Sequence, residues 1–564
     1  MAIKRQVLDV AMRHFGGIGN ADQSLTGSCH NFIVKYTNGE QTSILIDLGA
    51  FQGLGRNLNP ILPFEVSAIT AVIVTHGHID HCGRLPMLFN QKAVQFMGDV
   101  YSTELTKKVM STALLDSAKI FATEYEHEKR RYDKFIADLK DARRIVARSE
   151  STGIKRDSGG SRNEAHNHRP SRELYDTAKS LLREQKVAKE ADIYTKITKP
   201  LPPIFTLDDV GIAMKGTTEV TYSENKKVVW QEICPEISFS LWNAGHVAGS
   251  CSVLLRVAAG KTKMKYYFFS GDLGPYRTPI HPFGLPEVPN FPLEMVVMET
   301  TYGDKVRKEF DEGYREFEES VIKASQTRER LIIPCFALDR AQQVMFLLVK
   351  MQQEGKLKGE ILLDSPLATA YTTLYHQYGI PGSGMDLLKP GPETFEMMDT
   401  TTREGVLADK EGFKIIVTSS GMATGGPIMT YLTKYLDDLE TTFMFMGYMA
   451  DGTLGRELTD EIKPKKLVRL PDVANPIEVI ARVKRFNFIS GHMDQKDLWE
   501  WYKQLHLLPT ARVVLVHGDR DSSTLEFKHF LRRRSQDAVP HKGVMIPEVG
   551  NILVPDVIDE YSVF

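Results

Sequence analysis

The sequence predicts an α/β protein with more than one domain, and three observations support this prediction. The chain has 564 residues, which is more than one hydrophobic core usually serves. Short apolar strands that end in glycine-flanked polar turns recur before residue 303 and after residue 456. Between residues 305 and 465, helices and strands alternate. This alternation is typical of a parallel sheet covered by helices.

The composition is that of an ordinary globular chain. Hydrophobic residues make up 42% and charged residues 25% of it, and the net charge of −2 excludes a global basic field. A nucleic-acid partner would therefore need a locally positive surface or bound metal ions. The five cysteines are scattered without a Cys-x-x-Cys pair, which favours reduced thiols. We find neither a signal-peptide pattern at the N-terminus nor a membrane-spanning run of about 18 apolar residues. We therefore expect a cytoplasmic protein without a membrane association.

The first third of the chain is predicted to begin with strands and to continue into a charged insertion. Strands at 31–36 and 42–47 are followed by a short helix around 85–89. Residues 103–148 carry apolar side chains at helical spacing, which predicts a long helix. The segment 151–172 is rich in Ser, Gly and Asn, which predicts a mobile loop. The basic residues of this insertion fit either a solvated helix face or a strip that binds a phosphate backbone.

The rest of the chain returns to strands, then alternates, then returns to strands again. The first group of strands is predicted at 236–241, 251–257 and 263–269. In the alternating part we expect helices at 317–324 and 341–351 and strands at 331–334, 361–364, 414–417 and 443–447. Two further strands end in polar turns near residues 490 and 517.

The densest group of potential metal ligands follows a predicted buried strand. Ile69–Val74 is apolar and β-branched, and His76, His78, Asp80 and His81 lie within six consecutive positions after it. Histidine and carboxylate ligands suit zinc or another first-row metal, and the lack of thiolate pairs argues against a closed structural zinc site. Because strand-end loops on a rigid scaffold often carry function, we predict a metal-binding turn here.

Polar residues at the ends of other predicted strands extend this group. They are Asp47, His246, Asp272 and His492. Zinc takes about four ligands, so the seven candidates that remain without Asp47 are too many for one ion. They suit two ions that share a carboxylate. Such a pair can hold a bridging hydroxide and stabilise the attacking and leaving oxygens of a phosphoryl centre.

Several motifs resemble one known family. The order His-x-His-x-Asp-His, Gly-His, Gly-Asp and a late histidine resembles the metallo-β-lactamase fold. Further motifs resemble the β-CASP branch of that fold, above all the bacterial and archaeal relatives of the nuclease subunit of the cleavage and polyadenylation specificity factor; RNase J is more distant. These motifs are Thr26–His30, Met298–Gly303, Ile333–Gln342, Leu363–Ala368, Thr418–Met422, Gly447–Tyr448, Gly452–Arg456 and Val516–Asp519.

The resemblance implies a fold and a domain order. The expected fold class is α/β, a metallo-β-lactamase αββα sandwich with an inserted α/β β-CASP domain. The first part of the sandwich would span 1–303, with the charged insertion at about 104–200. The β-CASP domain would span 304–455, and the C-terminal part of the sandwich 456–564.

The resemblance also implies two Zn²⁺ per chain and assigns their ligands. Asp272 would bridge the two ions, and Asp47 would orient a ligand. The remaining ligands would form one set of His76, His78 and His246 and a second set of Asp80, His81 and His492.

The implied activity is zinc-dependent hydrolysis of RNA phosphodiester bonds by a two-metal bridging hydroxide. RNA-acting members carry His in the Ser-x-His-x-Asp motif, where DNA-repair relatives carry Val, and Ser490–Asp494 is of the RNA type. We expect single-stranded RNA as the substrate and endonucleolytic or 5′ exonucleolytic cleavage. The expected catalytic residues are Asp80, Asp272, Glu299 and His492.

Outer residues of the site are less specific. Ser365, Ser419, Ser420 and Arg340 are candidates for contacts with substrate phosphate. The Arg340 guanidinium could instead form an ion pair with Glu299 or Asp364. His517 could hydrogen-bond near the site or pack the last strand.

Two positions depart from the family pattern. Glu457 stands where related nuclease subunits often have a histidine that is a proposed proton donor, so the general acid is unassigned; Glu299, Glu457 or a metal-bound water could serve. Asp339 stands where relatives usually have glycine.

Three other functions remain open from the sequence. The same fold could cleave DNA, or hydrolyse small esters or thioesters, or bind RNA without catalysis; loss of metal ligands would favour the last. A homodimer, and a protein partner for the insertion at 104–200, are further possibilities.

Overall fold

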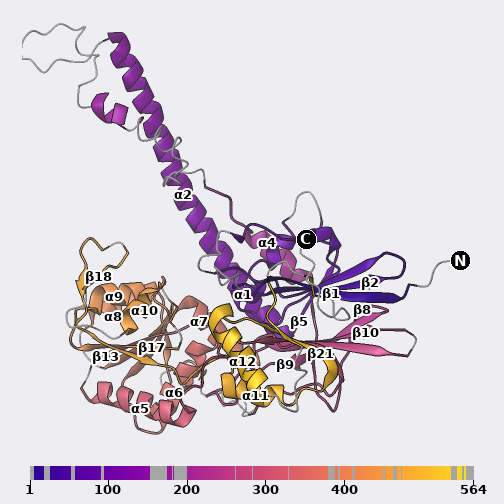
Figure 1. Ribbon diagram of the computed structural model, residues 1–564. Helices are drawn as coiled ribbons and strands as arrows, with labels where there is room; N and C mark the ends of the chain where they lie inside the picture. The colour runs from indigo at the N-terminus through magenta and orange to yellow at the C-terminus, as the bar shows by residue number, and fades with distance from the viewer. Residues whose placement is uncertain are drawn as a thin grey trace, which may run out of the picture. The chain divides into compact units, whose positions relative to one another are not determined.

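The structure is a computed structural model of the chain, and Figure 1 shows its ribbon. Two compact units divide the chain, one of Met1–Leu115 with Asp209–Phe564 and one of Asp116–Asp208. The described residues are 5–17, 26–52, 58–90, 95–152, 175–180, 182, 200–260, 262–281, 284–327, 329–378, 388–391, 394–409, 413–447, 449–450, 452–460, 467–471, 473–534, 543–548 and 552–553.

The first sheet of the larger unit has seven strands in the order β23-β1-β2-β3-β4-β5-β6. Strands β1 to β3 pair antiparallel, and β3 to β6 pair parallel. The strands are β1 (Val7–Gly16), β2 (Cys29–Tyr36), β3 (Gln41–Ile46), β4 (Ala71–Ile73), β5 (Asp99–Ser102), β6 (Thr217–Glu219) and β23 (Ile552–Leu553).

The second sheet has eight strands in a path of seven, β22-β21-β12-β11-β10-β9-β7, with β8 also paired to β9. The strands are β7 (Tyr222–Ser223), β8 (Gln231–Cys234), β9 (Ile237–Asn243), β10 (Cys251–Ala258), β11 (Met264–Phe269), β12 (Leu293–Glu299), β21 (Leu507–Val516) and β22 (Val544–Met545). Alternate apolar residues of both sheets form one buried cluster that includes Phe32, Ile44, Phe239 and Val253. The two sheets therefore pack face to face.

Helices cover the outer face of the second sheet. Leu498 and Trp501 of α11 (Gln495–Tyr502) and Phe527 of α12 (Leu525–Arg534) are buried in one cluster with residues such as Phe268 and Val296. Asp494 begins α11 by accepting hydrogen bonds from the backbone N–H groups of Lys496 and Asp497. This N-cap satisfies donors that a helix start otherwise leaves unpaired. Figure 1 shows both helices against this sheet.

A third sheet of six parallel strands has the order β15-β14-β16-β13-β17-β20. Its strands are β13 (Arg330–Pro334), β14 (Glu360–Asp364), β15 (Glu396–Met397), β16 (Lys414–Thr418), β17 (Thr441–Met446) and β20 (Arg482–Phe486). One face is covered by α5 (Phe310–Gln326), α6 (Arg340–Gln353) and α7 (Pro366–Tyr378), and the other by α8 (Thr400–Ala408), α9 (Ile428–Tyr435) and α10 (Leu454–Thr459). The predicted alternation of helices and strands is confirmed.

The third sheet continues beyond residue 455, where the sequence predicts a return to the sandwich. β20 pairs parallel with β17 from Thr442↔Arg482 to Met446↔Phe486. The charged residues Arg482, Lys484 and Arg485 conceal this strand in the sequence, because an edge strand tolerates and often needs charges. The boundaries at 303 and 455 stay predictions.

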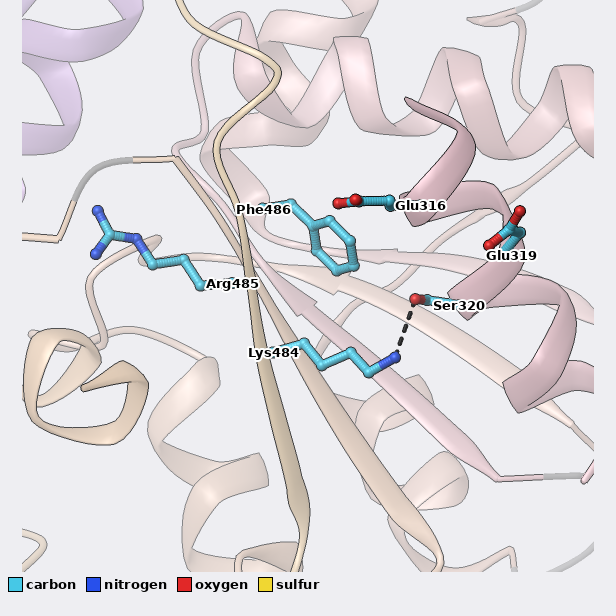
Figure 2. A pocket seen from close by; sticks show the side chains of 6 residues that line it. All are labelled: Glu316, Glu319, Ser320, Lys484, Arg485 and Phe486. Carbon is cyan, nitrogen blue, oxygen red and sulfur yellow. Dashed lines mark hydrogen bonds between the residues drawn. The ribbon is translucent and has the colours of Figure 1, made fainter. Parts of the chain in front are cut away.

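An open groove of about 390 Å³ lies between β20 and α5. Figure 2 shows its lining of Glu316, Glu319, Ser320, Lys484, Arg485 and Phe486. The Lys484 Nζ donates a hydrogen bond to Ser320 Oγ at 3.0 Å. The lining of the groove carries charges of both signs and includes none of the predicted site residues.

The charged insertion is helical at its start. Helix α2 spans Glu104–Thr152, which confirms the predicted helix at 103–148. Ser151 and Thr152 of the predicted loop belong to this helix, and the rest of that loop lies outside the described residues. Within the smaller unit, Leu139, Ala142 and Ala178 are buried. Among the described helices, none is both long and apolar enough to cross a membrane.

Candidate metal centre

The predicted site residues follow strands whose carboxyl ends meet at one edge of the sandwich. Ile46 of β3 pairs with Ile73 of β4, and Glu299 of β12 pairs with Val516 of β21, both in parallel register. Asp47, the cluster at 76–81, Asp272 and His517 come directly after these strands or after β11. Parallel strands therefore bring residues from distant parts of the chain together.

Two glycines permit the close approach of the loops that carry these residues. A Cβ atom on Gly49 would lie 1.6 Å from the carbonyl oxygen of Asp80, and one on Gly274 would lie 1.8 Å from that of Gly245. Any side chain at either position would push a ligand-bearing loop away.

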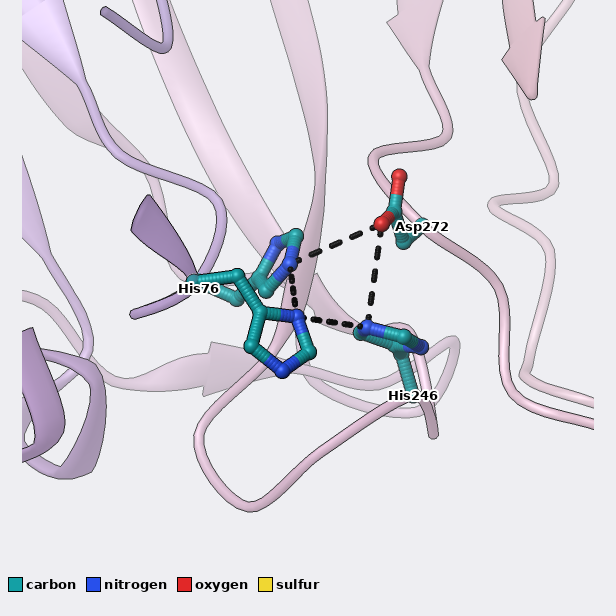
Figure 3. Close-up of side chains that lie close together, drawn as sticks. His76, His246 and Asp272 are labelled. Atoms are coloured by element: carbon teal, nitrogen blue, oxygen red, sulfur yellow. Dashed lines mark hydrogen bonds and ion pairs between the residues drawn. The ribbon is translucent and has the colours of Figure 1, made fainter. Parts of the chain in front are cut away.

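Three histidines and one aspartate form the first group. His78 Nδ1 lies 3.0 Å from His76 Nε2 and 3.1 Å from His246 Nε2. Asp272 Oδ2 lies 3.6 Å from His76 Nε2 and 3.7 Å from His246 Nε2. Figure 3 shows His76, His246 and Asp272 pointing toward one another. The possible ligand atoms of the four residues all lie within 4.8 Å of one another.

A second group adjoins the first and consists of Asp80, His81 and His517. His517 Nε2 lies 3.0 Å from His81 Nε2 and 3.5 Å from Asp80 Oδ2. Asp80 and His81 lie in the short helix α1 (Ile79–Cys82), which His78 precedes. The predicted cluster at 76–81 therefore contributes to both groups.

Asp272 lies between the two groups. Its Oδ2 is 3.3 Å from His81 Nε2, and its Oδ1 is 3.5 Å from His517 Nδ1. The carboxylate is buried, and its Oδ1 takes no hydrogen bond among the described residues. This position is the one expected of a bridging carboxylate.

Asp47 fixes the orientation of the His81 ring through a hydrogen bond from Nδ1. Its Oδ2 accepts a hydrogen bond from His81 Nδ1 at 2.7 Å, and its Oδ1 accepts one from the backbone N–H of Thr75 at 2.7 Å. The Nδ1 proton is thereby fixed, and Nε2 of His81 is left as the free ligand atom. His246 is held in the same way, because its Nδ1 donates to the carbonyl of Gly491 at 2.6 Å.

His492 lies at the edge of this centre and contacts Glu299. Its Nδ1 is 3.1 Å from Glu299 Oε1 and 3.9 Å from Asp272 Oδ2. Asp272, His492 and His517 also form a possible ligand group. The buried Glu299 carboxylate accepts further hydrogen bonds from the backbone N–H groups of Leu273 and Thr301, at 2.7 and 3.1 Å.

The electrostatics favour neutral histidine in the first group and an ionised carboxylate between the groups. Burial, with the neighbouring histidines, lowers the pKa of His76 and of His246 well below the usual range. Burial raises the pKa of Asp272, but His517 and His81 outweigh it and hold that pKa well below its usual range. Neutral imidazole and carboxylate are the forms that bind metals.

The donor set fits two metal ions. Two imidazole-rich groups share the Asp272 carboxylate, and every histidine of the first group keeps a ring nitrogen directed at the centre. Zinc accepts such mixed histidine and carboxylate ligation. Neither of these two groups of described residues contains a cysteine.

Three of the four predicted phosphate contacts are serines, and each of them already makes a hydrogen bond within the protein. Ser419 Oγ donates to Ser365 Oγ at 2.9 Å, but Ser365 is buried and accepts the backbone N–H of Ala368 at the start of α7. Ser420 Oγ accepts the N–H of Thr424 at 3.0 Å. All of these serines lie at the carboxyl ends of β14 and β16.

Arg340 forms neither of the ion pairs considered for it. Asp364 is instead bound by Arg403 at 2.6 and 2.7 Å. Glu299 is occupied by the three donors named above. The guanidinium of Arg340 donates to the carbonyl of Ile489, and its buried Nε has no partner among the described residues. Its role as a phosphate contact stays a prediction.

The sequence left the role of His517 undecided between the site and packing, and the structure places it in the second group. The signal was present in its context, because His517 follows the apolar strand Val513–Val516 just as the other residues of the two groups follow theirs. Glu457, considered as a general acid, lies exposed on α10.

Family models match three parts of the chain. Residues 26–132 match the metallo-β-lactamase superfamily, and residues 341–458 match the Beta-Casp domain. Residues 476–529 match the Zn-dependent metallo-hydrolase RNA specificity domain. These matches confirm the expected fold class.

Curated relatives match most of the chain at low identity. The transcription termination factor FttA of Methanocaldococcus jannaschii is 27% identical over 520 residues, which cover 90% of this chain and 68% of the relative. FttA of Methanococcus maripaludis is 27% identical over 466 residues, 81% of this chain and 59% of the relative. The ribonuclease TTHA0252 of Thermus thermophilus is 27% identical over 511 residues, 89% of this chain and 92% of the relative. The chain therefore contains metallo-β-lactamase, Beta-Casp and RNA specificity domains, the domains of a metal-dependent hydrolase, and it is similar over most of its length to a ribonuclease and to transcription termination factors.

Proposed function

We propose that this protein is a zinc-dependent ribonuclease that hydrolyses phosphodiester bonds of single-stranded RNA with two Zn²⁺. The position of Asp272 between two imidazole-rich groups carries the proposal. The match to an RNA specificity domain and the ribonuclease among the relatives support RNA as the substrate.

The residues that would hold the two ions follow from the two groups. His76, His78 and His246 would hold one zinc, and Asp272 would be shared. For the second zinc we favour Asp80, His81 and His517, because His517 Nε2 lies within 3.5 Å of both partners. When bound, the two ions polarise the phosphodiester and make hydroxide available at neutral pH.

In this assignment His492 is not a zinc ligand, and we assign it the role of donating a proton to the leaving oxygen. Glu299 accepts the Nδ1–H of His492, so that the opposite atom, Nε2, can carry and release a proton. The His492 side chain is 19% exposed, whereas that of Glu299 is fully buried. A substrate can therefore reach the histidine but not the glutamate, and a positioned histidine is the commonest general acid.

The test combines metal analysis with cleavage of matched RNA and DNA strands, each labelled at either end. We expect close to two zinc ions per chain, cleavage of RNA, and loss of cleavage in Asp272→Ala with the fold retained. A folded protein without metal, or an active Asp272→Ala variant, would refute the two-zinc assignment. Preferential cleavage of DNA would refute the substrate. The position of the label in the products separates endonucleolytic from 5′ exonucleolytic cleavage.

A further inference from the structure

Asp339 has a backbone conformation that side chains rarely adopt. Its φ and ψ are 65° and −50°, and the N–H of Arg340 donates to the carbonyl of Leu338 at 2.7 Å. This hydrogen bond closes a three-residue turn around Asp339 with a positive φ at its centre, a strained form. Such strain persists only where the surroundings hold the residue in place, and it is a reason to search for a function.

The surroundings of Asp339 are a buried network of hydrogen bonds. Its Oδ1 accepts from His281 Nε2 at 2.7 Å and from the Tyr375 hydroxyl at 2.9 Å, and its Oδ2 accepts from Gln343 Nε2. Burial raises the pKa of this carboxyl, but His281 and the hydroxyl of Tyr375 outweigh it and bring the pKa to about 2. Asp339 is therefore an ionised acceptor for all three donors.

Tyr375 connects this network to the metal centre. While its hydroxyl donates to Asp339, the hydroxyl oxygen accepts the backbone N–H of Ala248 at 3.1 Å. Burial, with the adjacent Asp339 carboxylate, raises the pKa of Tyr375 well above its usual value, so the phenol keeps its proton. Ala248 lies two residues after His246, in the loop between β9 and β10.

Apolar packing reinforces this connection. Val247 and Ala248 of the loop are buried in the same cluster as Leu338 and Tyr375. The loop thus contacts the third sheet's helices on one side, while its carbonyl at Gly249 accepts hydrogen bonds from Thr103 and Thr106 on the other, at 2.8 and 2.7 Å.

We propose that Asp339 and Tyr375 are positioning residues that hold the loop 244–250, and with it His246, from the side of the inserted α/β domain. Docking of that domain is thereby coupled to the affinity of the metal centre. This inference rests on the proposed function in one respect, the metal ligation by His246. His281 contributes by fixing the Asp339 carboxylate against the tyrosine.

The variant Tyr375→Phe removes the hydroxyl and keeps the buried ring. Tyr431 of α9, a helix that covers the same sheet, is a matched control, because its hydroxyl also donates to an aspartate, Asp364 Oδ2, at 2.6 Å. Tyr431→Phe therefore also removes a buried Tyr–Asp hydrogen bond, but Tyr431 belongs to another apolar cluster, and among the described residues it makes no hydrogen bond to the loop. The variant Asp339→Gly removes the carboxylate and relieves the positive φ at the same time.

The first readout is amide hydrogen exchange of the metal-free protein at His246 and Val247. Both N–H groups donate to Ser250 Oγ and not to Tyr375, so they report on the loop and not on the deleted hydrogen bond. We expect faster exchange at both amides in Tyr375→Phe and Asp339→Gly and unchanged exchange in Tyr431→Phe. Faster exchange at Ala248 alone, or equal changes in the control, would overturn the proposal.

The second readout is the competition between the zinc-loaded protein and a chelator. We expect zinc affinity to fall about 10-fold in Tyr375→Phe, as for other residues that orient ligands, and to stay unchanged in Tyr431→Phe. Unchanged zinc affinity in Tyr375→Phe would refute the coupling. A wild-type protein that binds no zinc would refute the proposed function instead, and the exchange experiment would still decide whether the loop is held.

Discussion

Nδ1 of His492 lies 3.1 Å from Oε1 of Glu299, in a contact between the segment before α11 and the end of β12. Glu299 is fully buried, and its other oxygen accepts the N–H of Thr301. The glutamate is therefore fixed, and it fixes the histidine in turn. The contact with Glu299 favours His492 as a proton donor and not as a metal ligand, and the first prediction tests this difference.

We predict that His492→Ala lowers the rate of RNA cleavage by about 10²- to 10⁴-fold, the range for loss of a general acid. A substrate with a phenolate leaving group, such as bis(p-nitrophenyl) phosphate, needs no protonation and should lose far less. The two rates are measured side by side in steady-state assays. An equal loss on both substrates would contradict the proton-donor role.

His517→Ala should act on metal content and not on the leaving group. Because His517 Nε2 completes the group of Asp80 and His81, we expect its loss to release one of the two zinc ions and to abolish cleavage of both substrates. Elemental analysis after dialysis measures the change. His492→Ala is the matched control, and loss of zinc from it in place of His517→Ala would restore the ligand set that the resemblance implied.

Asp47 provides a third prediction, because it orients His81 without reaching the centre. Asp47→Ala removes the acceptors of His81 Nδ1 and of Thr75. We expect zinc affinity to fall by about 10- to 100-fold, as is typical for such orienting carboxylates. Competition with a chelator gives the affinity, and an unchanged value would mean that Thr75, whose Oγ1 lies 3.5 Å from His81 Nδ1, suffices to hold His81.

The sequence predicted those parts of the site that depend on local context. His76, His78, Asp80 and His81 could be assigned from their spacing after one buried strand, and Asp272 from its turn after another. The resemblance assigned His492 to the set of Asp80 and His81, whereas we propose His517. Both histidines follow strand-like segments, and only the tertiary structure determines which imidazole faces Asp80. The same limit applies to β20, whose charged residues suit a sheet edge that the sequence does not reveal.

The network around Asp339 was also beyond the sequence. His281, Asp339 and Tyr375 are far apart in the chain, and none has a motif that links it to the others. Asp339 could be noticed only as a departure from glycine. Its partners depend on how α6 and α7 pack against the loop after β9, which is a property of the tertiary structure.

The ionisation of Asp339 gives a prediction about stability and pH. The folded-state pKa is about 2, below the value of about 3.9 for an unperturbed aspartate. The carboxylate therefore stabilises the fold fully above about pH 4, and this contribution is lost as the pH falls from about 4 to about 2. The shift corresponds to about 2 to 3 kcal/mol. The loss of stability in Asp339→Asn is smaller than this, because the amide oxygen still accepts one hydrogen bond. We expect the free energy of unfolding of the wild type to exceed that of Asp339→Asn at pH 6 and the difference to disappear near pH 2.

Urea titrations of both proteins in the presence of a chelator measure this difference in the free energy of unfolding, because groups common to both proteins cancel in it. A difference that persists unchanged down to pH 2 would mean that Asp339 contributes through its shape alone.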